Sequence, residues 1–343
     1  MKGVMKWLQA NNPDADDVTR IFEMTRIDLI DPQFLIENVV FSKFISDNDC
    51  VQQMIKNVWY SEYLTTGCNS RRVDVFVLHW DKTSLLSCFT SEGTWEDVPP
   101  APVDPGWWYS AASLGNKIYI TGGGSRTKCT LVYDVCRREW ETGPDLKRER
   151  FVHCMATANS KVYAIGGTYS NTIEEMSENW QVVGDLKQNR EHAFAATVGH
   201  NILVMGGRSE GCGSDVIQCF NTATRCVSNL SSRLPYSSES LRGSVHLPGV
   251  YLLDGDGNVM HVHVSDNDGE IKIQVKSTEK WRSFKYWFGV SWQNGSLLSF
   301  SGWDTNCEIR KYKLPERKED NITFLKSTRS GNVFGVLPVC HKA

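Results

Sequence analysis

The pattern of apolar and polar residues changes near Gly67. Before this glycine, apolar residues recur at helical spacing, as in the stripe formed by Val4, Met5, Trp7 and Leu8. After it, short alternating segments follow one another, separated by glycine, proline and polar residues. The pattern therefore predicts a short helical segment followed by a longer part built from β-strands.

The helical segment, residues 1–66, contains residues that favour helix starts. Asp, Asn and a following proline are typical of the first turn, because their side chains or missing N–H groups suit the unpaired end of a helix. The expected caps are Asp14 or Asp16, Asp31 before Pro32, and Asp47 or Asn48. Short amphipathic helices with brief polar links indicate an array of helical hairpins.

The β-rich part repeats an apolar strand that ends in glycine. The clearest copy spans residues 162–167, which read VYAIGG. Five similar segments begin at Val75, Ile118, Ile202, Val250 and Leu297, so the copies follow one another at steps of 40 to 48 residues. A period of this length that holds four short strands is typical of a β-propeller blade.

The two ends of the β-rich part complement each other. No convincing strand precedes the first copy, whereas residues 333–339 form a strand that no glycine pair follows. We therefore expect segment 333–339 to supply the innermost strand of blade one. Such closure would remove the exposed edges of the sheet.

The glycine pairs, together with Tyr133-Asp134, Trp140 and Arg150, resemble the kelch repeat. The resemblance implies a mainly β fold, a six-bladed kelch propeller over residues 70–340, preceded by a short α-helical segment. Residues 1–66 are similar to the C-terminal part of the BACK domain of BTB–BACK–kelch proteins, through MKGVMKWLQ and TRIDLIDPQFL. Together these likenesses point to the kelch-like family.

The family resemblance implies a non-enzymatic protein-interaction module. Family members usually act as substrate adaptors of cullin-RING ubiquitin ligases, in which the BTB domain and the first BACK helices recruit the cullin and the propeller holds the substrate. Neither the BTB domain nor the N-terminal half of BACK is recognised in this sequence, so a cullin partner is expected only for a longer form. The alternative is an actin-binding, cytoskeletal or scaffolding kelch protein without ligase coupling.

Composition argues against several other functions. A net charge of −3 and a pI near 6.3 give no reason to expect nucleic acid or an anionic membrane as partner. Eleven cysteines without a CxxC pair suit reduced thiols, and hence the cytoplasm or the nucleus. We expect no cofactor or metal, because His261 and His263 provide only two visible ligands.

The repeated glycines and tryptophans are assigned to architecture. No GxxxxGK[ST] or GxGxxG motif accompanies a glycine pair, so a phosphate loop is not indicated. Glycine instead allows a turn and a close backbone approach near the propeller axis. Trp140 and Trp180 are expected to be wedges between blades, with the indole N–H groups hydrogen-bonded.

The candidate partner-binding residues lie in the connections that precede inner strands or follow the glycine positions. These connections form one face in kelch propellers. The candidates are Trp107, Trp108, Arg126, Arg150, Arg190, Arg208, Trp287, Trp303 and Arg329, with Lys128 and Lys285 in the same connections. Guanidinium groups can hold carboxylates bidentately, so a short acidic peptide or loop is the expected ligand. The alternative for each arginine is a structural one, with hydrogen bonds to backbone carbonyls of neighbouring blades.

Overall fold

The computed structural model describes residues 1–25, 27, 30, 35, 39, 42–46, 48–52, 54–55, 71–246, 249–267, 270–281, 283–284, 286–293, 296–303, 306–313, 318–320, 324–326 and 332–342. The expected helix caps Asp31 and Asp47, and the site candidates Lys285 and Arg329, lie outside the described residues.

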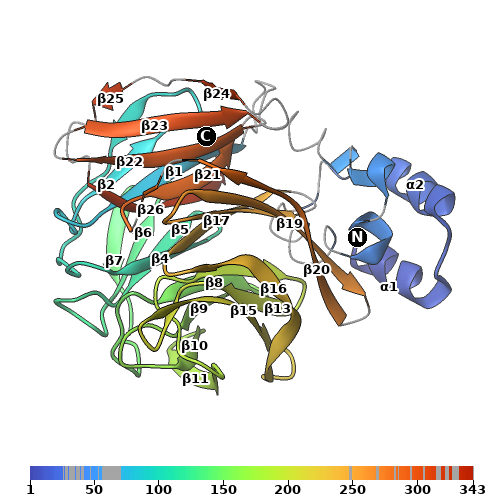
Figure 1. The fold of residues 1–343 in the computed structure, drawn as a ribbon, viewed down its shortest axis with the longest axis horizontal. Coiled ribbons are helices and arrows are strands. Elements are labelled where there is room, and N and C mark those ends of the chain that lie inside the picture. Colours follow the sequence, from blue (N-terminus) through green and yellow to red (C-terminus); the bar gives the residue numbers. More distant parts are fainter. Residues whose placement is uncertain are drawn as a thin grey trace.

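Six antiparallel sheets form the propeller and surround a common axis (Figure 1). Blade one contains β26 (Val333–Lys342), β1 (Arg71–His79), β2 (Leu86–Phe89) and β3 (Trp95–Asp97). Blade two contains β4 (Ser110–Leu114), β5 (Lys117–Thr121), β6 (Thr130–Asp134) and β7 (Glu139–Thr142). Blade three contains β8 (Cys154–Ala158), β9 (Lys161–Ile165), β10 (Thr172–Met176) and β11 (Trp180–Asp185).

The remaining blades follow the same order, with longer outer strands in blades four and five. Blade four contains β12 (Phe194–Val198), β13 (Asn201–Met205) and β15 (Cys212–Asn221), to which both β14 (Arg208–Ser209) and β16 (Val227–Ser238) pair. Blade five contains β17 (Leu241–His246), β18 (Gly249–Asp254), β19 (Asn258–Asn267) and β20 (Glu270–Lys280). Blade six contains β21 (Gly289–Gln293), β22 (Ser296–Trp303) and β23 (Asn306–Lys313), to which β24 (Lys318–Asp320) and β25 (Phe324–Lys326) pair. The sequence-based expectation of a six-bladed, mainly β propeller is confirmed.

Blade one joins the two ends of the β-rich part. β26 is the innermost strand and pairs antiparallel with β1, from Arg71 opposite Lys342 to His79 opposite Val333. A buried contact of 2.8 Å between His341 Nε2 and Asp74 Oδ2 crosses the same pair of strands. The ring of blades is therefore closed by strands far apart in the sequence.

The innermost strands of blades two to four consist largely of small residues, which suits their convergence on the axis. β4 reads SAASL, β8 reads CMATA and β12 reads FAATV. The strands behind them carry the larger apolar side chains, and β13 is buried along its whole length. This gradient of side-chain size leaves room along the axis while filling the space between blades.

The glycine pairs have the structural role expected from their recurrence. Gly122 and Gly166 both have positive φ, at 63° and 64°. A Cβ on Gly122 would lie 2.3 Å from the carbonyl oxygen of Arg150, and one on Gly166 would lie 2.9 Å from that of Arg190. Both the backbone conformation and the close approach of the next blade therefore require glycine.

Each of the two tryptophans expected between blades forms a hydrogen bond to the preceding blade. Trp180 is fully buried, and its indole N–H donates to the Thr130 hydroxyl of blade two at 2.9 Å. The indole N–H of Trp140 donates to the carbonyl of Pro99, which follows blade one, at 2.8 Å. The prediction of buried wedges with hydrogen-bonded indoles is confirmed for Trp180, and Trp140 is half-buried.

The helical segment contains α1 (Lys2–Asn11), α2 (Ala15–Glu23) and α4 (Lys43–Ser46). Asp14 caps α2 by accepting the N–H of Asp17 at 2.9 Å, and the Asn48 side chain accepts the N–H of Val51 at 3.1 Å. Met5 and Leu8 are buried as the apolar stripe predicts, whereas Trp7 is 48% exposed. None of the described helices is long and apolar enough to cross a membrane.

The helical segment packs against blade five (Figure 1). Leu8 and Phe22 belong to the same buried apolar cluster as Val262, Val264 and Ile271 of the β19–β20 hairpin. These strand residues lie towards the turn between β19 and β20, at the end of the blade remote from the glycine-pair loops. The helices and the glycine-pair loops thus lie on opposite sides of the propeller.

Candidate functional site

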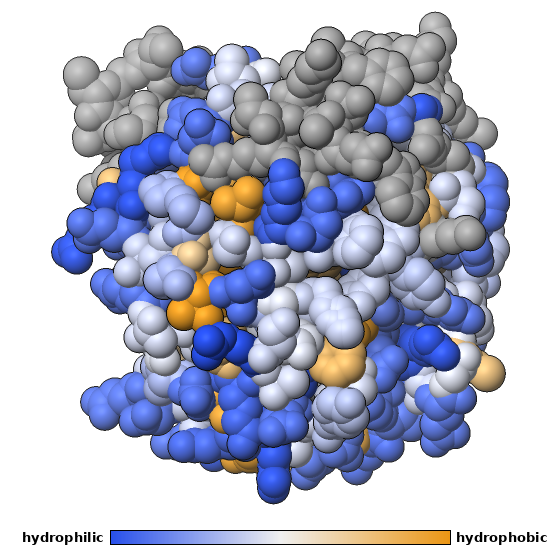
Figure 2. Space-filling model, turned by 90° about the vertical axis from the view of Figure 1, so that its left-hand side faces the viewer, coloured by the Kyte–Doolittle hydropathy of each residue, from blue (hydrophilic) through white to orange (hydrophobic). Residues whose placement is uncertain are grey.

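The connections that carry most site candidates lie on one side of the propeller, which we call the loop face. It contains the loops after the glycine positions and the connections that lead into inner strands. Figure 2 views the molecule from the side opposite the helices, and the described surface there is mainly hydrophilic with separate apolar patches.

A chain of backbone hydrogen bonds links four blades on the loop face. Trp108, Val152 and His192 occupy the same place in successive blades, and each has a positive φ, of 61°, 58° and 53°. The N–H of Val152 donates to the carbonyl of Trp108 at 2.9 Å, and the N–H of His192 donates to that of Val152 at 3.0 Å. Leu241 continues the chain by donating to His192 at 3.0 Å. Left-handed backbone is unfavourable for a β-branched residue such as Val152, so these bonds hold a strained rim in place.

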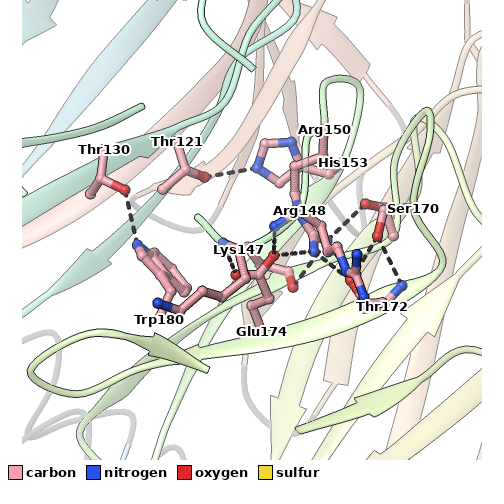
Figure 3. Close-up of polar contacts among 12 residues, drawn as sticks. Thr121, Thr130, Lys147, Arg148, Arg150, His153, Ser170, Thr172, Glu174 and Trp180 are labelled. Carbon is pink, nitrogen blue, oxygen red and sulfur yellow. Dashed lines mark hydrogen bonds and ion pairs between the residues drawn. The ribbon is translucent and has the colours of Figure 1, made fainter. Parts of the chain in front are cut away.

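Arg150 forms a buried structural centre with Glu174 (Figure 3). One guanidinium nitrogen lies 2.6 Å from a Glu174 carboxylate oxygen, and both side chains are fully buried. The other terminal nitrogen donates to the carbonyls of Gly166 and Thr172, at 2.9 and 3.0 Å. Glu174 also accepts the N–H groups of Lys147 and Arg148, so every strong interaction of this arginine is directed into the protein.

Arg190 is likewise fully buried. Its guanidinium donates to the carbonyl of Asn189 at 3.0 Å and to the side-chain oxygen of Gln188 at 3.1 Å. Its own carbonyl accepts the N–H of Gly167 from the preceding blade at 2.8 Å. The geometry of Arg150 and Arg190 favours the structural alternative, because neither guanidinium is open to a ligand.

Three aromatic side chains form a row on the loop face, and the two outer members of the row are exposed. Trp107 is 45% exposed and stacks on Phe151, with ring centroids 6.4 Å apart. Phe151 contacts Tyr169 edge-on at 5.5 Å, and Tyr169 is 75% exposed. This aromatic row, Trp107–Phe151–Tyr169, spans the connections of blades two and three.

A second group of aromatic residues surrounds the end of the propeller axis. Trp108 stacks on Trp287 with centroids 4.9 Å apart, and Trp287 contacts Trp80 at 4.6 Å. This mouth cluster consists of Trp80, Trp108, His192, Tyr286, Trp287 and Phe334. Burial, with Arg242 and Arg208 nearby, lowers the pKa of His192 to about 3, so this imidazole is neutral at physiological pH. The cluster brings together residues from blades one, two, four and six.

The cationic candidates that remain open to solvent are fewer than the sequence suggests. Arg126, Lys128 and Arg208 are exposed. Arg208 lies close enough to the mouth cluster to influence the pKa values of His192 and Tyr286. The backbone of Trp303 pairs with Asn306 at the end of β22, and its side chain lies outside the described part.

Sequence reasoning missed part of the aromatic surface. Phe151, Tyr169, His192 and Tyr286 were not among the named candidates. Phe151 directly follows Arg150, and Tyr169 stands two residues after Gly167, so both occupy connections already assigned to this face. Repeat position could have indicated them, but their ring contacts depend on how neighbouring blades pack.

The described residues provide no metal-binding group of three or more His, Cys, Asp or Glu side chains. The His261 ring stacks on Tyr251, with centroids 4.3 Å apart. This contact gives His261 a packing role in blade five.

Comparison with known proteins agrees with the repeat pattern. The kelch motif model matches residues 109–147. Kelch-like protein 26 of Danio rerio is 26% identical over 136 residues, which cover 34% of this chain and 22% of that protein. Kelch-like protein 35 of Mus musculus is 20% identical over 246 residues, which cover 64% of this chain and 43% of that protein. The chain thus spans less than half the length of these relatives.

A solved structure shares the fold. The structure of YjhT superposes with a TM-score of 0.54 at 12% identity, covering 65% of this chain and 85% of that one. The closed ring of six antiparallel sheets and the kelch motif define a kelch-type β-propeller. The chain is thus similar to kelch-like proteins and carries a kelch motif.

Proposed function

We propose that this propeller is a protein-binding module whose partner contacts the aromatic row on the loop face. The observation that carries the proposal is the exposure of Trp107 and Tyr169 on a rim of strained, hydrogen-bonded backbone. Aromatic side chains provide large contact areas at low entropic cost and are enriched where binding energy concentrates. A rigid rim adds to affinity because little backbone has to be ordered on binding.

The chemistry of the partner follows from the residues that surround the row. Arg126, Lys128 and Arg208 are exposed cations on the same face and suit an acidic segment of the partner. Arg150 and Arg190 support this surface from inside and do not contribute ligand contacts. The proposed acidic motif therefore depends on exposed side chains of blades two and four, and Arg329 remains a candidate.

We further propose that the module serves as the substrate-recognition part of a cullin-RING ligase adaptor. The relatives are kelch-like proteins, and the helical segment, which resembles part of a BACK domain, packs opposite the loop face. Such an arrangement would separate the ligase-recruiting end from the substrate. Recruitment of a cullin requires the BTB domain of a longer form, and a cytoplasmic or nuclear location would suit that role.

The test compares captured proteins between the wild type and a Trp107→Ala/Tyr169→Ala variant, using quantitative affinity purification. Trp7→Ala is a matched control, because Trp7 is equally exposed but lies on the helical segment. We expect specific partners to be lost, at least tenfold, with the double variant alone. Equal recovery with all three proteins would refute the loop-face proposal. Recovery of filament proteins without any cullin, from a BTB-containing form, would favour the cytoskeletal alternative.

A further inference from the structure

A channel of about 750 Å³ runs along the propeller axis. Inner strands of all six blades contribute to its wall, among them β4, β8, β12, β17, β21 and β26. At one end its lining includes Trp108 and His192 of the mouth cluster. At the other end it includes Gly115 and Cys136, which are exposed, so the channel reaches the surface there. Its volume lies within the range of sites that hold small organic molecules.

The wall of the channel carries an unbalanced charge. Arg242 lines it, and none of the described lining residues is an aspartate, a glutamate or a lysine. The rest of the wall is mostly alanine, serine, threonine, valine and glycine from the inner strands. A guanidinium surrounded by neutral groups produces a positive potential that water screens poorly inside a narrow channel.

Arg242 has hydrogen-bonding capacity to spare. Its Nε donates to the carbonyl of Phe334 at 3.1 Å, and one terminal nitrogen donates to the carbonyl of Leu241 at 3.0 Å. The guanidinium carbon lies 5.6 Å from the Phe288 ring centroid, a cation–π contact that helps to fix the side chain. Arg242 forms no ion pair with any described carboxylate, and three of its five N–H groups are left for another partner.

The pKa values of Arg242 and of two neighbouring side chains show that no described group nearby balances this charge. Burial lowers the pKa of Arg242 to about 10, so the side chain remains a cation at neutral pH. Its positive charge contributes to the low pKa of His192. Burial raises the pKa of the neighbouring Cys154 thiol to about 12, so this group provides no negative charge either. Arg242 is half-buried, and a cation held away from bulk water without an anionic partner is costly unless something else supplies the charge.

We propose that the channel binds a small organic monocarboxylate from solution, held through its carboxylate by Arg242. A ligand with one negative charge matches the one cation of the described wall. A second negative charge on the ligand would be buried among neutral groups. The uncharged body of the ligand would lie against the small side chains of the inner strands. This site is separate from the loop-face surface, so it stands or falls independently of the protein-binding proposal.

The test measures binding of benzoate and phenylacetate to the whole chain by isothermal titration calorimetry, with benzamide as the neutral match of benzoate. We expect at least one acid to bind at least tenfold more tightly than benzamide, phthalate and inorganic phosphate. Quenching of tryptophan fluorescence should accompany binding, because Trp108 and Trp292 line the channel. Failure of both acids to bind more tightly than benzamide would overturn the proposal. The proposal would also be overturned if neither acid bound but an acidic hexapeptide with blocked ends did. Arg242 would then serve a protein partner.

Substitutions test whether the ligand binds within the channel. Arg242→Gln should weaken binding at least tenfold, while Arg20→Gln, which removes an exposed guanidinium on α2, should change it less than twofold. Ala195→Leu on β12 narrows the channel but keeps Arg242, and should also abolish binding. This second variant keeps the test decisive if Arg242→Gln does not fold. Unchanged affinity in Ala195→Leu would contradict a ligand in the channel.

Discussion

Blades three and five both place an arginine near the start of an inner strand and use it in opposite ways. Arg150, just before β8, is enclosed with Glu174 and backbone carbonyls inside a blade that keeps the glycine pair and the tryptophan of the repeat. Arg242, on β17, faces the channel without a carboxylate partner, in a blade where Asp254 replaces the first glycine of the pair. In blade three the charge is paired with a carboxylate of the same blade, whereas in blade five no described carboxylate pairs with it.

The largest expected loss of stability comes from removing the buried ion pair of blade three. Arg150→Ala should lower the free energy of unfolding by about 3–5 kcal/mol, because Glu174 and the carbonyls of Gly166 and Thr172 would lose their buried partner. Urea denaturation provides the measurement. Arg126→Ala, an exposed control on the same face, should stay within about 0.5 kcal/mol of the wild type. Similar losses in the two variants would show that Arg150 is not a structural centre.

The glycine pair of blade two provides the next test, with a glycine of similar conformation as its control. Gly115 has a φ of 60° and no heavy atom within 4 Å of a Cβ position, whereas Gly122 has a φ of 63° and the Arg150 carbonyl oxygen at 2.3 Å. Gly115→Ala should cost about 1 kcal/mol from backbone strain. Gly122→Ala should cost about 2 kcal/mol more, since the next blade has to move away. If thermal or urea unfolding gave the same loss of stability for both variants, the positive φ alone would explain why glycine is needed at position 122.

Acidification should destabilise the protein through His192, whose pKa is lowered by burial and by the nearby arginines. Burial, together with Arg242 and Arg208, lowers the pKa of His192 in the folded protein from its usual value of 6.5 to about 3. The unfolded chain therefore binds a proton below pH 6.5 that the folded protein does not, and stability falls as the pH falls through this window. Between pH 7 and pH 5 the contribution of His192 should be a loss of about 2 kcal/mol.

The His192→Asn variant should remove that part of the pH dependence. Asparagine tolerates the positive φ of this position. The wild-type protein, measured beside the variant, provides the comparison. Buried His153, whose pKa is also lowered by burial, should maintain a residual pH dependence of stability of the same sign in the variant. An undiminished slope in His192→Asn would contradict the assignment.

The smallest expected effect concerns Arg242 itself. Arg242→Met should change the free energy of unfolding by about 1 kcal/mol or less, because the two lost hydrogen bonds are offset by relief of a buried, unpaired charge. Urea denaturation beside Arg150→Ala gives the direct comparison. A loss as large as that of Arg150→Ala would indicate that Arg242 is a structural residue, and would remove the contrast between the two blades.

Much of the propeller could be predicted from local sequence. The glycine pairs, the tryptophan-led strands and the closing segment 333–339 are set by backbone conformation and by the need to bury strand faces, which leave a periodic pattern. The assignment of residues 1–66 to a BACK-like domain stays a prediction. The site was harder to predict, because Arg150, Arg190 and Arg208 look alike in the sequence and differ only in what surrounds them.

By itself, the sequence determined the helical and β-rich regions, the number of blades and the glycine and tryptophan positions that hold them together. Each of these features depends on residues close together in the sequence or on the repeat, so it can be recognised from the sequence pattern. The tertiary structure alone decided which arginines are enclosed, how Trp107, Phe151 and Tyr169 meet in a row, and that Arg242 lines the channel without a carboxylate. The reason is that burial and charge pairing depend on side chains brought together from different blades, and sequence spacing does not encode those distances.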